Sequence, residues 1–255
     1  MSAARDMLCD TARAVFADAA VAGMAPVEEA GFALLLVPEA DGGFGGDWGD
    51  VHAVLRIAGE VAPDLPIAAL ILSGAGRDGM GENGFGALSA AATVSLIAGA
   101  MGRALALSID HVNMRQQFGR PLGKFQAVQQ SLAVMACEVR AVDAAAAALA
   151  ARLDATGIDP AQADFEIAAA KLRANRAVGV VTGIAHQVHG AIGFTREYDL
   201  HRVTIPLMRW RGAHGHDAHW ARVLGRQVAG FGGRGLWEAL TARTDPVAPA
   251  DGRAG

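Results

Sequence analysis

The segment MRQQFGRPLGKFQAVQQSLAVMACEVRA, residues 114–141, places a polar loop directly before a long helical pattern. The loop contains Arg115, while Gly119, Pro121 and Gly123 break any helical periodicity within it. Beyond the loop, apolar residues recur at steps of three and four, on one face of a helix: Phe125, Val128, Leu132, Met135, Val139, Val142 and Leu149. The segment therefore predicts that one helix ends before the loop and a second begins just after it.

Helical patterns on both sides of this segment predict an antiparallel four-helix bundle. Upstream, apolar residues share one face at Val94, Ile97, Met101, Leu105, Ile109 and Val112. Downstream, Asp159 as N-cap and Pro160 at the first helical position predict where a third helix begins. This helix carries Ile167, Leu172, Val178, Val181 and Val188, and a fourth is expected over about 215–229. Long helices with short connections are typical of such bundles.

The rest of the chain predicts an all-α protein with no sustained strand pattern. Four shorter helical patterns, over 6–20, 25–36, 49–62 and 67–76, precede the bundle, with a glycine-rich loop at 37–50. The apolar run 32–37 is too short to separate helix from strand. We therefore expect a helical domain at 1–73, a glycine-rich linker at 74–88, the bundle at 89–241 and a disordered tail at 242–255.

Composition narrows the classes of function. The chain is 52% hydrophobic and 19% charged, which suits a packed protein with some apolar surface covered by another subunit. A net charge of −4 does not indicate a nucleic-acid binder. Cys9 and Cys137 lack zinc-type spacing, which fits a reducing cytoplasm, although one disulfide is an alternative. The N-terminus does not read as a signal peptide, and we expect no membrane span.

The loop residues themselves suggest a phosphate site. Arg115 and Gln126 should lie at the same end of the bundle as residues 186–197, where Gly190 and Gly193 close the third helix. An arginine fork, side-chain amides and exposed glycine backbone can bind a phosphate or a nucleotide. The alternative is structural: the arginine caps helix carbonyl groups and the glycines stop a helix.

Three separated segments, in order, resemble the acyl-CoA dehydrogenase family. They are GFALLLVPEADGGFGGDWGD (31–50), RQQFGRPLGKFQAVQQSLAVMA (115–136) and AAAKLRANRAVGVVTGIAHQVHGAIGFTREYDLHR (168–202). In that family the bundle of one subunit touches the FAD of its neighbour. The resemblance implies FAD binding through Arg115 at the pyrophosphate, together with Gln117, Phe118, Gln126, Gln187 and Gly190. Ala191 stands where the family usually has a second glycine, and its methyl group could crowd a close backbone contact.

Two departures from the family concern catalysis. The family's middle β-barrel domain, which packs against the flavin, has no room between the N-terminal helices and the bundle. The glutamate that removes the substrate α-proton is also missing. Its usual position falls on His214, followed by the matching Gly215, and its alternative position falls near Ser89. His214 is therefore the candidate catalytic base, with Asp217 and Glu197 as weaker ones.

The cluster HGHDAHW (214–220) could also bind a metal ion, with His214, His216, Asp217 and His219 as ligands. Only some of these residues share a helical face, so polar residues at a helix start explain them better, and we predict no metal site. GGFGG at 42–46 follows no strand–turn–helix unit, which excludes a dinucleotide-binding fold there.

Three functions are compatible with this sequence. The first is a subunit that helps a second acyl-CoA dehydrogenase-like chain hold FAD. This is what the resemblance implies, because some bacterial members of the family consist of two different chains and act on steroid-type or other bulky acyl-CoA. A homodimer is also compatible with this function. The second is a self-sufficient flavoenzyme with a base other than glutamate. The third is a non-enzymatic scaffold, which would have no reason to keep Arg115, Gln126 and Gln187 together.

Overall fold

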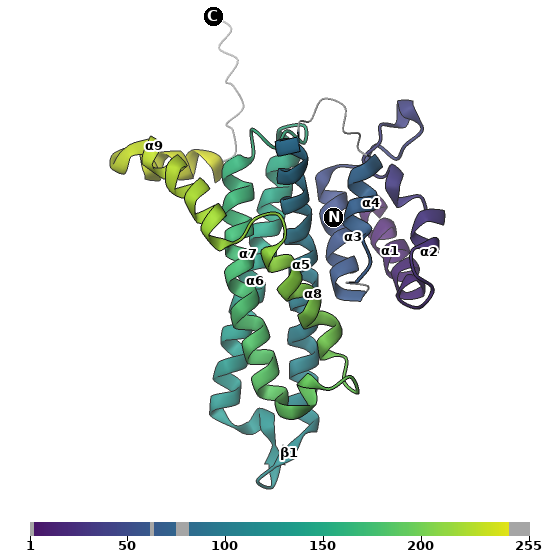
Figure 1. Ribbon diagram of the computed structural model, residues 1–255, viewed down its shortest axis with the longest axis vertical. Helices are drawn as coiled ribbons and strands as arrows, with labels where there is room; N and C mark the ends of the chain where they lie inside the picture. Colours follow the sequence, from purple (N-terminus) through teal and green to yellow (C-terminus); the bar gives the residue numbers. More distant parts are fainter. Residues whose placement is uncertain (1–2, 62–63, 75–81, 245–255) are drawn as a thin grey trace, which may run out of the picture.

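The computed structural model describes residues 3–61, 64–74 and 82–244. Helices α1 (Ala3–Ala22), α2 (Ala25–Glu29), α3 (Trp48–Val61) and α4 (Ile67–Gly74) form an N-terminal unit beside an elongated bundle (Figure 1). The bundle contains α5 (Glu82–Met114), α6 (Gln126–Ala155), α7 (Asp164–His189) and α8 (Leu200–Gly212), and α9 (Asp217–Thr244) follows. The all-α prediction is confirmed.

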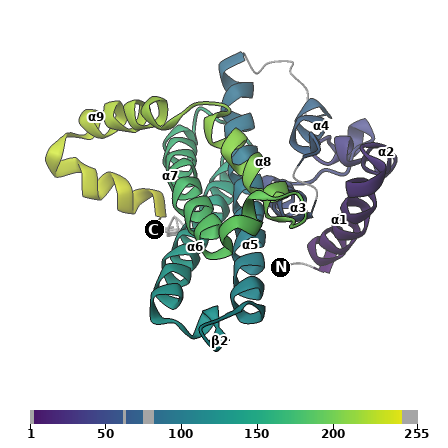
Figure 2. The ribbon, with the colours of Figure 1, turned by 60° about the horizontal axis from the view of Figure 1, so that its bottom comes forward.

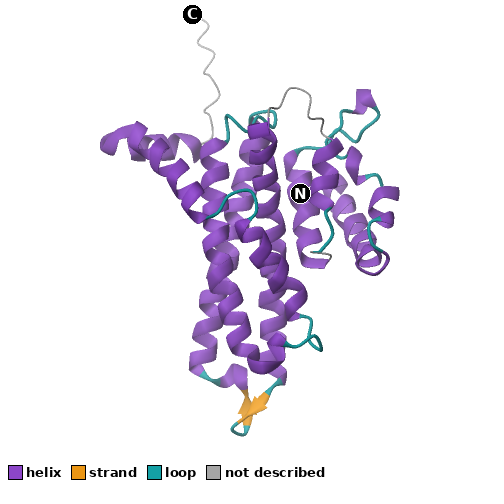
Figure 3. Ribbon diagram, viewed as in Figure 1, coloured by secondary structure: helices purple, strands orange, loops and turns teal. Residues whose placement is uncertain are grey.

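Strand structure in the described ranges is confined to one hairpin. Strand β1 (Gln116–Gln117) pairs antiparallel with β2 (Arg120–Pro121) at the lower tip of the bundle (Figure 3). Short 3-10 turns occur at Phe32–Leu34, Glu39–Asp41, Leu122–Lys124 and Gly190–Phe194. The ambiguous run 32–37 is therefore no strand. No β-barrel domain is present in the described residues, and only seven residues, 75–81, separate α4 from α5.

The fourth bundle helix is α8 rather than the helix expected over 215–229. Leu200, Val203, Leu207 and Trp210 follow the helical period and are buried against α5 and α7. The expected range lies within α9, which leans away from the upper part of the bundle and bends at Gly232 (Figure 1). The prediction was wrong because residues 203–212, which form most of α8, were assigned to no helix in the sequence analysis.

Three predicted boundaries also shift. Helix α7 begins at Asp164, because the Asp159 carboxylate accepts hydrogen bonds from Ala161 N (2.9 Å) and Gln162 Nε2 (2.9 Å) and so forms a turn. Helix α4 ends at Gly74 and α5 begins at Glu82, so eight residues of the expected linker, 74 and 82–88, are helical, while 75–81 lie outside the described residues. Helix α9 extends to Thr244, and the remainder of the expected tail, 245–255, lies outside them.

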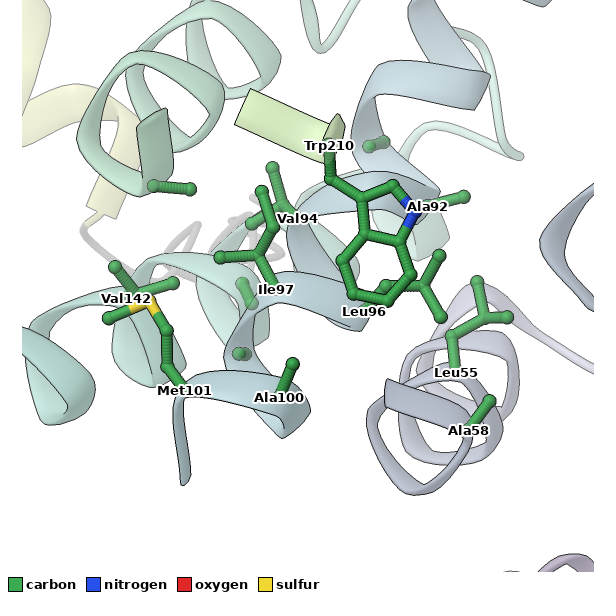
Figure 4. Close-up of a cluster of buried hydrophobic side chains, with 14 of the residues drawn as sticks. Leu55, Ala58, Ala92, Val94, Leu96, Ile97, Ala100, Met101, Val142 and Trp210 are labelled. Atoms are coloured by element: carbon green, nitrogen blue, oxygen red, sulfur yellow. The ribbon is translucent and has the colours of Figure 1, made fainter. Parts of the chain in front are cut away.

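Helix α5 forms the centre of the core. It packs on α3, α6, α7 and α8, and every residue from Leu88 to Met101 is buried. Figure 4 shows Met101 of α5 beside Val142 of α6, and Leu96 of α5 between Trp210 of α8 and Leu55 of α3. This burial explains why α5 is long and apolar enough to cross a membrane: 78% of its most hydrophobic window lies inside the protein. The stretch 164–194 passes the same test, with 39% buried.

Helices α3 and α5 cross with almost no space between their backbones. A Cβ atom on Gly99 would lie 1.8 Å from the Arg56 carbonyl oxygen, and one on Gly59 would lie 2.1 Å from the Leu96 carbonyl oxygen. Beside this crossing, Arg56 Nε donates to Asp143 of α6 (2.8 Å), and His52 contacts Ser95 (3.0 Å). The crossing therefore fixes the N-terminal unit against the bundle.

Asp154, near the end of α6, caps α3 from outside. Its two carboxylate oxygens accept hydrogen bonds from the backbone N–H groups of Trp48 (2.5 Å) and Gly49 (3.1 Å). Those N–H groups open α3 and have no acceptor within the helix. Asp47 caps the same helix locally, since its Oδ1 accepts a hydrogen bond from Asp50 N (2.7 Å), so a neighbouring and a distant carboxylate together complete the start of α3.

We predict that Gly99→Ala lowers the free energy of unfolding by about 2–3 kcal/mol, because the added methyl group forces α3 away from α5. Gly102→Ala is the matched control, since it lies in the same helix with nothing within 4 Å of the added Cβ. That control should stabilise the protein by about 0.4–1 kcal/mol. Urea unfolding measures both, and equal stability of the two variants would contradict a tight crossing.

Candidate functional site

A cavity of about 880 Å³ lies at the hairpin end of the bundle. Its walls come from the end of α5, the hairpin, the first turns of α6, the end of α7 and the 3-10 turn after it. Figure 2, which brings this end forward, shows how α5 and α6 meet at the hairpin. Four of the six predicted FAD contacts line the cavity: Arg115, Gln117, Gln187 and Gly190.

Arg115 is the only one of these four that carries charge. Its backbone is fixed, since its N–H donates to the His111 carbonyl (2.8 Å) and its own carbonyl accepts from Leu122 N (2.9 Å). Its guanidinium is exposed and forms no ion pair or hydrogen bond within the described ranges. It therefore does not cap helix carbonyls in this structure, and it is available to an anion.

Phe118 and Gln126 lie at the same end of the bundle but do not line the cavity. Phe118 is the turn residue of the hairpin, with a left-handed φ of 54° and 89% exposure. Its ring meets Phe125 edge-on at 6.1 Å, and the Arg120 guanidinium covers Phe125 at 4.1 Å. Gln126 is exposed at the first position of α6. The hairpin thus forms a rim that projects beyond the cavity.

The cavity suits a negative ligand. No aspartate or glutamate contributes to its lining. Ala127 and Val128, in the first turn of α6, contribute to it, and the N-terminus of a long helix carries partial positive charge. Gly190 has φ 63° and ψ −142°, a conformation that glycine adopts readily and other residues rarely do. Its backbone is exposed at the wall of the cavity. Ala191, the departure from the family, also lines the cavity and is exposed.

Two further residues of the cavity were missed by the sequence analysis. His111 of α5 and His189, the last residue of α7, both line it, and both are buried. Their rings stack at 4.4 Å. His189 sits inside the recognised Gln-Val-His-Gly motif, but His111 lies in a helix read only for its apolar face. Nothing in the sequence pairs two residues 78 positions apart.

His214 lies elsewhere, in the turn after α8, and does not line this cavity. Since α8 starts near the hairpin end and runs upward, the turn lies toward the other end of the bundle (Figure 1). His214 has a left-handed φ of 53°, which is strained for a residue with a side chain. Trp220 Nε1 donates to the carbonyls of His214 (3.1 Å) and Gly215 (3.1 Å) and so holds the turn.

A buried lysine supports the same turn. Lys171 Nζ donates to Asn175 Oδ1 (2.5 Å) and to the Trp210 carbonyl at the end of α8 (3.1 Å), and Asn175 donates to Gly215 O (3.1 Å). The pKa of His214 is lowered, first by partial burial and then by the Lys171 charge. The imidazole is therefore neutral near pH 7, the form in which a histidine can accept a proton.

The other candidate positions for the catalytic base lie in different environments from His214. Asp217 pairs with Arg211 (3.2 Å), and Glu197 is exposed. Ser89 is buried and donates to the Phe85 carbonyl (2.8 Å). Among the described residues, no group of three or more His, Cys, Asp or Glu side chains could hold a metal ion.

Comparison with known proteins defines the family. Residues 87–228 match the model of the acyl-CoA dehydrogenase C-terminal domain. The chain belongs to the acyl-CoA dehydrogenase family. It is 36% identical over 141 residues to 3-sulfinopropanoyl-CoA desulfinase of Paraburkholderia xenovorans, covering 55% of this chain and 33% of that protein. It is 35% identical over 191 residues to acyl-CoA dehydrogenase FadE34 of Mycobacterium tuberculosis, covering 71% of this chain and 23% of that one.

The chain thus spans a third or less of the length of these two dehydrogenase-family relatives. Among solved structures, it resembles the ChsE4–ChsE5 complex from Mycobacterium tuberculosis, with a TM-score of 0.76 at 17% identity over 90% of this chain and 98% of that one. At this identity the likeness concerns the fold, and it extends to the N-terminal unit as well as the bundle.

Lys171 gives a prediction of pH dependence. Burial lowers its pKa from 10.5 to about 8, and Asp217 opposes this shift. Below pH 8 folded and unfolded chains both hold the proton, and the full cost of the buried charge applies. Between pH 8 and 10.5 the unfolded chain binds more protons, so the contribution of Lys171 to the free energy of unfolding rises with pH.

We therefore expect wild type to gain roughly 1–3 kcal/mol relative to Lys171→Met between pH 7.5 and 10.5. Urea unfolding at both pH values measures this difference. The chain's other lysine, Lys124, is exposed and gives the control Lys124→Met, for which the difference should not change with pH. A constant difference for Lys171→Met would contradict the lowered pKa.

Proposed function

We propose that this chain is an acyl-CoA dehydrogenase subunit that supports FAD-dependent α,β-dehydrogenation of an acyl-CoA, as the FAD-holding partner of a second dehydrogenase-like chain. The observation that carries this proposal is the unpaired Arg115 guanidinium, grouped with Gln117, Gln187 and the Gly190 backbone in one cavity. These groups come from two segments about 70 residues apart in the chain, which makes their convergence informative.

The residues present fit the diphosphate end of FAD. The guanidinium can form two parallel hydrogen bonds to phosphate oxygens, and the two glutamine amides can donate further ones. Gly190 lets the main chain approach without a side chain between. A cavity of this size is within the range of cofactor sites, and no carboxylate in its lining would repel the ligand.

The division of work between two chains follows from what the chain lacks. When bound, the flavin accepts the hydride from the β-carbon of the acyl-CoA. Removal of the α-proton needs a base, and neither His214 nor Ser89 is a carboxylate. In this proposal the partner chain provides the base and the flavin ring site, while this chain neutralises and orients the diphosphate.

The surroundings of the cavity support coverage by a second chain. Met114 is 71% exposed, Phe118 89% and Phe194 74%, and all three lie at the hairpin end or in the turn after α7. Exposed apolar residues gathered at one end mark an interaction site. ChsE4–ChsE5, whose fold the chain shares, is described as a complex of two chains. Cys9 and Cys137 are both free thiols, which fits the reducing cytoplasm that we propose as the location of this chain.

The first test is a visible absorption spectrum. We expect the chain alone to be colourless, and its complex with a dehydrogenase-like chain from a neighbouring reading frame to be yellow with flavin bands. Failure of the two co-expressed chains to co-purify would contradict the two-chain proposal. A yellow protein from this chain alone would instead favour the self-sufficient flavoenzyme.

We predict that Arg115→Ala lowers the FAD content of the purified complex at least tenfold, since a charge-assisted pair with a phosphate contributes about 1.5–3 kcal/mol. Arg140→Ala is the matched control, because Arg140 pairs with Asp143 on the surface of α6, away from the cavity. Flavin absorbance per mole of complex measures both. Equal FAD content in the Arg115 variant and wild type would count against the site.

A self-sufficient enzyme has one observation in its favour. His214 occupies the glutamate position in a strained turn, and its lowered pKa keeps it neutral. Loss of proton abstraction in His214→Gln, with FAD content unchanged, would support it.

A further inference from the structure

The inner wall of the cavity consists of two stacked imidazoles. His111 and His189 lie 4.4 Å apart with an angle of 26° between their rings. His111 is 9% exposed and His189 5%. The ring of Tyr198 closes the cluster, 4.9 Å from His189, and its hydroxyl donates to the Leu107 carbonyl (3.3 Å). Two ionisable groups therefore line a site that otherwise holds one fixed charge, Arg115.

The hydrogen bonds of His189 define where a proton can be added. Its Nδ1 lies 2.7 Å from the Ala185 carbonyl, which can only accept, so Nδ1 carries the hydrogen. In the neutral ring Nε2 then carries a lone pair and no hydrogen. Nε2 is buried and has no hydrogen-bond partner among the residues that the structure describes. The Leu107 carbonyl lies near enough to favour the charged ring, as the Ala185 carbonyl does.

Several effects keep both rings neutral in the absence of a ligand. Burial lowers the pKa of His189, and the neighbouring His186 lowers it further, against the two carbonyls. Burial also lowers the pKa of His111, and the charges of His189 and Arg115 lower it further. Other charged groups around the cluster lie near Tyr198: Arg103, Asp110 and Asp199. No carboxylate lines the cavity to balance an added positive charge.

We propose that the cavity binds a doubly charged oxyanion, such as the diphosphate of a dinucleotide, together with one proton taken up by the His111–His189 pair. The proton comes from solvent and adds to a ring nitrogen, so no covalent bond of the ligand changes. The bound anion supplies the missing counter-charge. Only one proton is taken up, because two positive rings 4.4 Å apart would repel each other. The identity of the ligand as FAD rests on the proposed function; the proton uptake does not.

Linkage gives the expected effect on affinity. Over the pH window between the pKa of the pair without anion and with it, affinity falls about tenfold for each unit of rising pH. Below that window the pair is already charged, and above it the anion binds to Arg115 and the amides alone. Affinity is then constant on both sides.

Sulfate is a suitable probe, because it keeps two charges from pH 5 to 8 and its own titration does not interfere. The Cε1–H resonances of the histidines, followed by NMR against pH with and without sulfate, report each ring directly. His111→Phe and His189→Phe assign the signals, and His111→Gln and His189→Gln replace them if the aromatic variants do not fold. His219, exposed on α9, serves as the internal control.

We expect sulfate to raise the pKa of one ring of the pair by about one unit or more, with no change at His219. We expect the Phe variant of that ring to remove the pH dependence of sulfate binding. Unchanged titration of the pair at saturating sulfate, or no sulfate binding at pH 5–8, would overturn the inference. This outcome is distinct from failure of the proposed function. If FAD content depends on Arg115 but the histidines do not respond to sulfate, the proposed function stands and the inference fails. If the histidines respond but FAD content does not depend on Arg115, the inference stands and the proposed function fails.

Discussion

The close crossing of α3 and α5 is the constraint on which the rest of the structure depends. Backbone carbonyls of each helix meet a glycine of the other, Gly99 against Arg56 and Gly59 against Leu96. With no side chain at these two points, α5 can be surrounded by α3, α6, α7 and α8 at once. A helix packed on all sides has little freedom to rotate or slide. Its last turn therefore carries His111 and Arg115 to fixed positions at the hairpin end.

The two candidate sites of the chain lie apart in the fold and differ in their residues. The hairpin end gathers an unpaired arginine, two amides and two buried imidazoles, with no carboxylate in the lining. The turn after α8 is held by hydrogen bonds from Lys171, Asn175 and Trp220, and it carries His214. Under the proposed function, this chain binds the diphosphate and the partner chain abstracts the proton. This asymmetry fits a subunit whose role is to hold a cofactor.

Short-range patterns account for the features that could be read from the sequence. The loop between α5 and α6, the positive φ at Gly190 and the absence of sustained strands all follow from residue periodicity and from glycine and proline positions. Asp159 shows the limit of this reasoning. Its side chain satisfies a turn at Ala161 and Gln162 as readily as a helix start, so the sequence could not separate the two. Helix α8 has the helical period at Leu200, Val203, Leu207 and Trp210, but most of it lies beyond the family segment that ends at residue 202, and the sequence analysis assigned it no helix.

By itself the sequence determined the all-α class, the bundle, the family and the position of Arg115 at a helix end, because these depend on periodicity and on contiguous motifs. Only the tertiary structure decided which helix closes the bundle, which of the six proposed FAD contacts share a cavity, and that His111 stacks on His189. Asp154 capping α3 from the far end of α6 is of the same kind. Each depends on contacts between residues distant in the chain, and such contacts are set by how close two helices can approach, which no local pattern encodes.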